Sequence, residues 1–184
     1  MWLSALMPRL QSGLDVQWLI VPRHPQRVDQ VQALLAQAGL RVVRRSGWSD
    51  QGPGPEAACD SAEVWLGDSL GEMALYYGLA DVALLGGSFA PLGGQNLIEA
   101  CACGCPVVMG PHTFNFLEAA AQAEVAGAAR RVVDMAAAVR LAQDLAKDAT
   151  ARQALARAGL AFAQTHKGAA RRVAGRIKDL LAQG

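Results

Sequence analysis

The sequence predicts an α/β fold: a doubly wound, mainly parallel sheet with helices on both faces. Two observations support this prediction. Short runs rich in Val, Leu and Ile alternate with longer segments whose apolar residues recur at helical spacing. The alternation continues without an internal repeat or a second core, so we expect a single domain over residues 1–184. Strands separated by helices form parallel sheets, which bind ligands at the carboxyl ends of their strands.

Six strands are expected, because six short apolar runs are of the type found in buried parallel strands. These runs lie at 15–22, 40–46, 63–69, 81–88, 105–110 and 128–133. Helices are expected at 1–13, 24–39, 70–80, 96–104 and 113–127, followed by two or three Ala-rich helices. Pro25 suits the first turn of its helix and Gly39 suits the C-cap. The segment 47–62 is rich in Gly and Pro and lacks periodicity, so it is expected to be a loop.

Composition and charge argue against several classes of protein. The formal net charge of +1 argues against a dedicated nucleic-acid surface. No apolar run approaches the roughly 20 residues that span a bilayer. The first residues lack the basic region and small-residue cleavage site of a secretory signal. A cytoplasmic location is therefore expected.

Three of the four cysteines lie in "CACGC", at Cys101, Cys103 and Cys105. Zinc sites use C-x-x-C pairs or suitably spaced histidines, whereas alternate residues of a helix point in divergent directions. Cys59 lies far away in the predicted loop. We expect small, buried, reduced thiols and no metal site.

The segment "GGSFAPLGGQNLIEA" (86–100) is the first candidate binding site. It reads as a glycine loop between the end of a strand and the start of a helix. A helix N-terminus offers unpaired N–H groups to an anion, and glycines let a backbone approach a ligand without a Cβ clash. Asn96 and Glu99 have two interpretations, either a capping box or contacts to a ligand. The glycines slightly favour a ligand.

Three other predicted strand ends also carry polar residues. "VPRHP" contains Arg23 and His24, "LGDSLGEM" covers 66–73, and "MGPHTFNF" covers 109–116. Arg23 could neutralise a phosphate or cap a carbonyl at the surface, and His24 could be a general base or a structural histidine. Four polar loops at one sheet edge predict a nucleotide-sized cleft. The sequence contains no GxxxxGK[ST], GxGxxG or GxSxG motif.

Together, "VPRHPQR", "LGDSLGEM", "GGSFAPLGGQNLIEA" and "GPHTFNF" resemble the C-terminal half of 3-deoxy-D-manno-octulosonic acid (Kdo) transferases. These are inverting GT-B glycosyltransferases of lipopolysaccharide synthesis. The resemblance spans roughly residues 5–165 and is densest at 80–118. It implies the Rossmann-like C-terminal half of a GT-B fold, with a CMP-Kdo donor and no metal or other cofactor. The acceptor, a lipid A precursor, would bind the N-terminal half.

The resemblance also implies a set of donor-binding residues. By position, they are Arg23 at the CMP phosphate, Gly71, Glu72 and Met73 beside the cytosine, Ser88, Gly93, Gly94 and Asn96 near the phosphate or sugar, Glu99 at the ribose hydroxyls, and His112 and Asn115 at the border of the pocket. Two positions depart from the family pattern. Gln95 stands where the family usually has His, and Ala100 stands where it usually has Pro.

In the family, the catalytic base, the acceptor site and the membrane anchor belong to the N-terminal domain. The resemblance implies that this domain lies outside the chain, together with the first strand of the C-terminal domain and its S-T-x-x-G-E-E-like turn. The chain is therefore expected to be inactive alone, and the full-length protein to lie at the cytoplasmic face of the inner membrane. A sheet without this strand has unpaired edges, so we expect either pairing with a second copy or distortion near Trp18–Val21.

Two alternatives remain open. Another GT-B-like protein, such as a nucleotide-sugar epimerase, would prefer uridine nucleotides to cytidine nucleotides. A non-catalytic binding module would bind no nucleotide.

Overall fold

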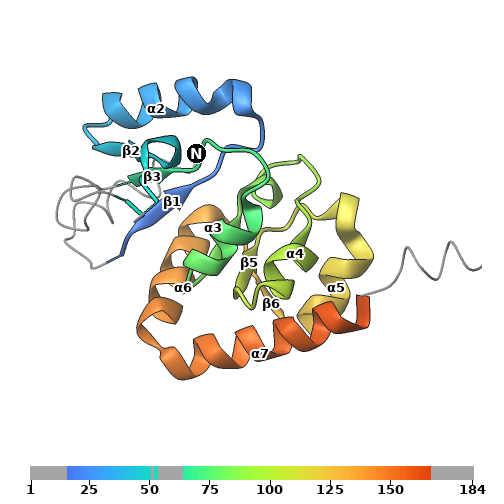
Figure 1. Ribbon diagram of the computed structural model, residues 1–184. Coiled ribbons are helices and arrows are strands. Elements are labelled where there is room, and N and C mark those ends of the chain that lie inside the picture. Colours follow the sequence, from blue (N-terminus) through green and yellow to red (C-terminus); the bar gives the residue numbers. More distant parts are fainter. Residues whose placement is uncertain (1–15, 51, 54–63, 167–184) are drawn as a thin grey trace, which may run out of the picture.

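The protein is described by a computed structural model that covers residues 16–50, 52–53 and 64–166 (Figure 1). The expected helix at 1–13 and most of the loop 47–62, including Cys59, lie outside these residues. So does the end of the chain after residue 166.

All strand pairs in the described part of the chain are parallel, and they form two three-stranded sheets. The first sheet has the order β1-β3-β2, with β1 at Trp18–Ile20, β2 at Val42–Arg44 and β3 at Val64–Leu66. The second has the order β4-β5-β6, with β4 at Ala83–Leu85, β5 at Val107–Met109 and β6 at Ala129–Arg131. The predicted parallel α/β fold is confirmed, and each strand falls within its predicted range.

The helices also follow the predicted order. They are α2 (Val28–Gln37), α3 (Met73–Leu79), α4 (Leu97–Ala102), α5 (Leu117–Val125), α6 (Met135–Lys147) and α7 (Ala149–His166). Short 3-10 turns lie at η1 (Pro25–Arg27), η2 (Arg45–Gly47), η4 (Gly86–Ser88) and η5 (Phe114–Phe116). Asp134 shows why α6 begins where it does, because its carboxylate accepts a 2.7 Å bond from the Ala137 amide.

Helices cover both faces of the β4-β5-β6 sheet. Val107 and Met109 of β5 point into a core formed with α4, α5 and α7, whereas Val108 points into a second core with α6. Successive strand residues face opposite sides, so three buried apolar residues in a row are what a strand covered on both faces requires. In Figure 1, α7 runs beneath α4 and β6. The β1-β3-β2 sheet has a smaller core around Leu35, Leu40 and Val64, beneath α2.

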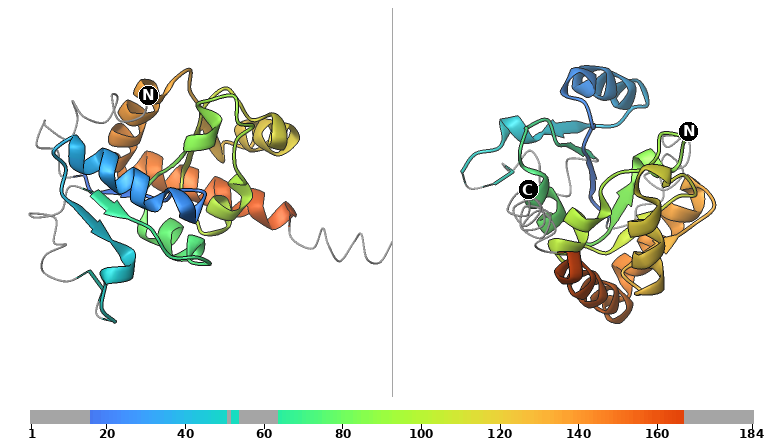
Figure 2. Two further views of the ribbon diagram at one scale, coloured as in Figure 1. Left: turned by 90° about the horizontal axis from the view of Figure 1, so that it is seen from above. Right: turned by 90° about the vertical axis from the view of Figure 1, so that its right-hand side faces the viewer.

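No strand pair joins the two sheets among the described strands. Among the described strands, β1 pairs only with β3 and β4 pairs only with β5, while α3 connects the two sheets. All three residues of β1 are apolar but only half-buried. The two alternatives expected for Trp18–Val21, distortion or pairing with a second copy, stay predictions, since β1 keeps a regular parallel register with β3. Figure 2 shows the two sheets from above and from the side.

An apolar edge strand such as β1, which has one strand partner within the described residues, favours pairing with another chain. We therefore expect the purified chain to self-associate at high concentration, and Leu19→Lys on β1 to suppress this association. Light scattering across a concentration series measures both. Leu34→Lys, at a 41% exposed leucine of α2, is the matched control. A chain that stays monomeric at every concentration would contradict the expectation.

Candidate functional site

The loops that follow β4 and β5 are joined by hydrogen bonds between their backbones. The His112 amide donates to the Ser88 carbonyl at 3.0 Å, and the Asn115 amide donates to the Gly93 carbonyl at 3.1 Å. The structure thus brings together five of the predicted donor-binding residues, which are Ser88, Gly93, Gly94, His112 and Asn115. They lie at the carboxyl ends of two paired parallel strands, where ligands of such sheets bind.

Ser88 is fully buried, and its hydroxyl is occupied by the protein itself. It donates to the Leu85 carbonyl at 2.6 Å and accepts from the Gly110 amide at 2.7 Å. In this arrangement the hydroxyl holds the two loops together. Ser88 would therefore affect ligand binding indirectly, because its hydroxyl fixes the positions of the two loops.

Gly93 and Gly94 are required by the contact between the loops. Both have a left-handed backbone, with φ of +87° and +83°. A Cβ at Gly93 would lie 2.1 Å from Asn115 Nδ2, and one at Gly94 would lie 3.3 Å from the His112 carbonyl oxygen. The close approach predicted for these glycines is therefore an approach to the protein's own second loop.

Asn96 and Glu99 have different roles at the start of α4. The Asn96 side chain accepts a 3.1 Å bond from the Ile98 amide, so it is the N-cap of the helix. Glu99 is exposed, and within the described residues its carboxylate completes no capping box and forms no hydrogen bond or ion pair. It lies within electrostatic range of Tyr77, whose pKa is raised to about 12 by burial and, next, by Glu99. The Glu99 carboxylate is thus open to a ligand.

Two further polar side chains bind within these loops. Thr113 begins the predicted helix at 113–127, but its side chain caps no helix and instead accepts a 3.1 Å bond from Arg131 Nη1. Gln95, where the family usually has His, accepts a 3.4 Å bond from the Gly87 amide. Both side chains contribute to holding the loops in place.

The remaining predicted residues form a second group, after β1 and β3. Arg23 is exposed in the loop between β1 and η1. The end of β3 packs closely on the end of β1, because a Cβ at Gly67 would lie 2.9 Å from Val21 Cγ2. Gly71 and Glu72 follow, and Met73 begins α3. In the part of the chain that the structure describes, no hydrogen bond or ion pair joins this group to the loops after β4 and β5.

Sequence reasoning missed several polar residues that hold these loops. Arg131, at the end of β6, donates from Nη1 to the Gly110 carbonyl at 3.1 Å and to Thr113, and pairs with Glu124 at 3.0 Å. Arg45 pairs with Glu72 at 2.8 Å. The available signal was a pair of adjacent arginines beside two valines, in "VVRRS" and "ARRVV".

Cys101 and Cys105 are buried free thiols, as predicted. Burial raises the pKa of Cys101 to about 11 and that of Cys105 to about 12, so both are protonated at neutral pH. Residues 16–50, 52–53 and 64–166 contain no cluster of three or more His, Cys, Asp or Glu side chains that could hold a metal ion. None of the helices in these ranges is long and apolar enough to cross a bilayer.

The raised thiol pKa values predict a loss of stability in alkali. Above the usual thiol pKa of 9.0 the unfolded chain releases protons that the folded chain keeps, so the free energy of unfolding falls as the pH rises further. Below that value these thiols contribute no pH dependence. Urea unfolding at a series of pH values above 9.0 measures this loss of stability. Cys105→Ala should reduce the pH dependence more than Cys103→Ala, which removes a half-buried thiol. A midpoint independent of pH would contradict the prediction.

Parallel strands with glycine-rich loops at their carboxyl ends place the chain among the Rossmann-like α/β domains, a fold class in which nucleotides bind at that edge of the sheet. The chain is similar in sequence to two 3-deoxy-D-manno-octulosonic acid transferases, at 52% identity over 163 residues in Bordetella pertussis and 35% over 164 residues in Haemophilus influenzae. A crystal structure of the C-terminal CMP-Kdo binding domain of WaaA from Acinetobacter baumannii is similar with a TM-score of 0.78 and 31% identity, over 88% of this chain and 81% of that chain. The chain belongs to the Kdo transferase family, and it corresponds to the C-terminal domain.

The two sequence matches each cover 89% of this chain but 37% of the relative, so the chain spans little more than a third of the length of these transferases. No protein-family model matches the chain.

Proposed function

We propose that this chain is the donor-binding domain of a Kdo transferase and binds CMP-Kdo. The observation that carries the proposal is the similarity to the CMP-Kdo binding domain of WaaA, over four fifths of that chain. The joined loops after β4 and β5 and the open Glu99 carboxylate support it, because the loops lie at the carboxyl ends of paired parallel strands, where such sheets bind ligands, and Glu99 belongs to the helix that follows β4.

The proposed donor site has two sides. Arg23 and the Gly71–Met73 segment would contact the phosphate and the cytosine. Glu99 would accept hydrogen bonds from the ribose hydroxyls, and His112 and Asn115 would border the pocket. An arginine fork and loop amides stabilise a phosphate leaving group without a metal ion. The nucleotide itself would then connect the two groups of residues.

In the full-length protein we propose that a separate N-terminal domain binds the acceptor and supplies the catalytic base. The enzyme would transfer Kdo from CMP-Kdo to a hydroxyl of a lipid A precursor, with inversion, in lipopolysaccharide biosynthesis. It would work at the cytoplasmic face of the inner membrane. Residues 1–184 alone would bind the donor but would not catalyse transfer.

A calorimetric titration with CMP, UMP and AMP tests the proposal. We expect millimolar affinity for CMP, about 4 kcal/mol, because a single half of a two-domain cleft makes only part of the contacts. UMP and AMP should bind more weakly. Arg23→Ala should weaken CMP binding, whereas Arg140→Ala, at an exposed arginine of α6, should not. A preference for UMP would favour the epimerase alternative, and no binding of any nucleotide would favour a non-catalytic module.

A further inference from the structure

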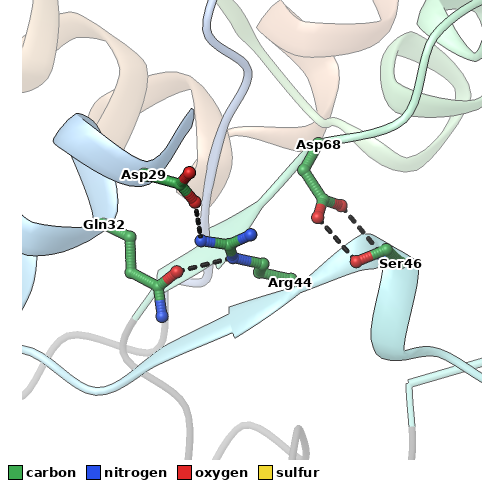
Figure 3. Close-up of polar contacts among 5 residues, drawn as sticks. All are labelled: Asp29, Gln32, Arg44, Ser46 and Asp68. Carbon is green, nitrogen blue, oxygen red and sulfur yellow. Dashed lines mark hydrogen bonds and ion pairs between the residues drawn. The ribbon is translucent and has the colours of Figure 1, made fainter. Parts of the chain in front are cut away.

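The segment that follows β3, residues 67–73, is bound by hydrogen bonds and an ion pair to the loop that follows β2. Figure 3 shows one of the two connections. The Ser46 amide donates to Asp68 Oδ1 at 2.8 Å, and the Ser46 hydroxyl donates to Asp68 Oδ2 at 2.6 Å. Both carboxylate oxygens of Asp68 are therefore bound to the same residue of the neighbouring loop, which fixes their orientation.

Arg45 makes the second connection. Its Nη2 donates to Glu72 Oε1 at 2.8 Å, and the Ser69 hydroxyl donates to the other oxygen of Glu72. The Arg45 guanidinium also lies 5.3 Å from the centre of the Trp48 ring, which in turn contacts Trp65 edge to face. Arg45 Nε and Trp48 Nε1 are both buried and have no hydrogen-bond partner in the described structure. The guanidinium is therefore held by Glu72 and the indole rather than by a full set of hydrogen bonds.

The middle of the 67–73 segment has little packing of its own. Leu70 is 79% exposed, and a Cβ at Gly71 would meet no atom within 4 Å, although the backbone there is left-handed with φ +78°. A segment with few contacts takes its position from its attachments. The Gly67 amide donates to the Ile20 carbonyl, and the Ser69 hydroxyl contacts the Tyr76 hydroxyl. The remaining side-chain attachments are the Asp68 and Glu72 carboxylates, and both bind residues of the loop after β2.

We propose that Arg45 is a positioning residue for the base-binding side of the donor site. It fixes Glu72, and with Ser46 it sets the course of residues 67–73, where the cytosine would lie. The inference rests on the proposed function, since it is this segment that would meet the base. On this inference, the loop after β2 supports nucleotide recognition, although it carries none of the predicted donor contacts.

The test compares two adjacent arginines. Arg45 and Arg44 have similarly exposed side chains, at 25% and 34%, and each pairs with a carboxylate. Arg44, however, is held by Asp29 and Gln32 of α2, away from the 67–73 segment (Figure 3). NMR titration with CMP should show about tenfold weaker binding in Arg45→Met and unchanged binding in Arg44→Met. Arg45→Lys, which keeps the charge, should recover part of the loss.

Two further measurements separate positioning from a general structural effect. Ribose 5-phosphate lacks the base, so its affinity should be the same in Arg45→Met and in the unmodified chain. Ser46→Ala keeps the amide bond to Asp68 and removes only the hydroxyl bond, so it should weaken CMP binding, but less than Arg45→Met does. It therefore tests the inference even if Arg45→Met does not fold. If the Arg45, Arg44 and Ser46 variants all bind CMP with the affinity of the unmodified chain, the inference is overturned and the proposed function still stands. An unmodified chain that does not bind CMP would overturn the proposed function, and this inference with it.

Discussion

Gly110→Ala is expected to lower the free energy of unfolding by about 3 kcal/mol. A Cβ at this position would lie 2.5 Å from the Ser88 carbonyl oxygen and 2.7 Å from Phe89 Cδ1. The carbonyl is backbone and cannot swing aside, because Ser88 is buried and the same oxygen accepts the His112 amide. Room for the methyl group must come from separating the loops after β4 and β5. CMP binding should therefore weaken together with stability.

Urea unfolding followed by circular dichroism measures the loss. Gly86→Ala is the matched control, because Gly86 lies in the facing loop after β4, has no left-handed backbone, and a Cβ there would meet no atom within 4 Å. Its effect should stay within about 0.5 kcal/mol. If the two variants lost the same stability, the close contact between the loops would not exist as described.

Glu99→Ala is expected to weaken CMP binding about thirtyfold, with almost no change in stability. Hydrogen bonds to a charged carboxylate contribute about 2 kcal/mol, and about 1.4 kcal/mol corresponds to a tenfold change in affinity. Stability should not change because the Glu99 carboxylate has no hydrogen bond or ion pair within the described residues. Glu118→Ala, at another exposed glutamate in the first turn of a helix, is the control for the loss of charge.

Comparison of CMP with 2′-deoxy-CMP gives this prediction a second readout. If Glu99 holds the ribose hydroxyls, removing the 2′-hydroxyl and removing the carboxylate delete the same contact. The effect of Glu99→Ala should then be smaller for deoxy-CMP than for CMP. Equal effects on both nucleotides would show that Glu99 acts elsewhere.

Much of the fold could be predicted because its signals are local. The run "PVVM" is apolar on both faces of a strand, and Val107, Val108 and Met109 are all buried as such a run requires. The strands are three residues long, shorter than the apolar runs that predicted them, because their ends turn into 3-10 turns and loops. The order β1-β3-β2 could not be predicted, since strand neighbours depend on contacts distant in sequence.

The candidate site was predicted less completely, for a related reason. Spacing alone left Asn96 and Glu99 with two interpretations, and the structure separates them into a cap and an open carboxylate. Ser88 was expected near the ligand, but a sequence cannot show that its hydroxyl is occupied by Leu85 and Gly110. Arg45 was missed because the residue it binds, Glu72, lies 27 positions away.

Backbone NMR of the isotopically labelled chain during titration with CMP tests the central claim most directly. A single nucleotide that lies across both sheets must perturb amides near Arg23 and Gly71 together with those near Gly93 and Glu99, at one common affinity. Perturbations confined to one of the two groups, or saturating at different concentrations in each, would contradict a shared donor site.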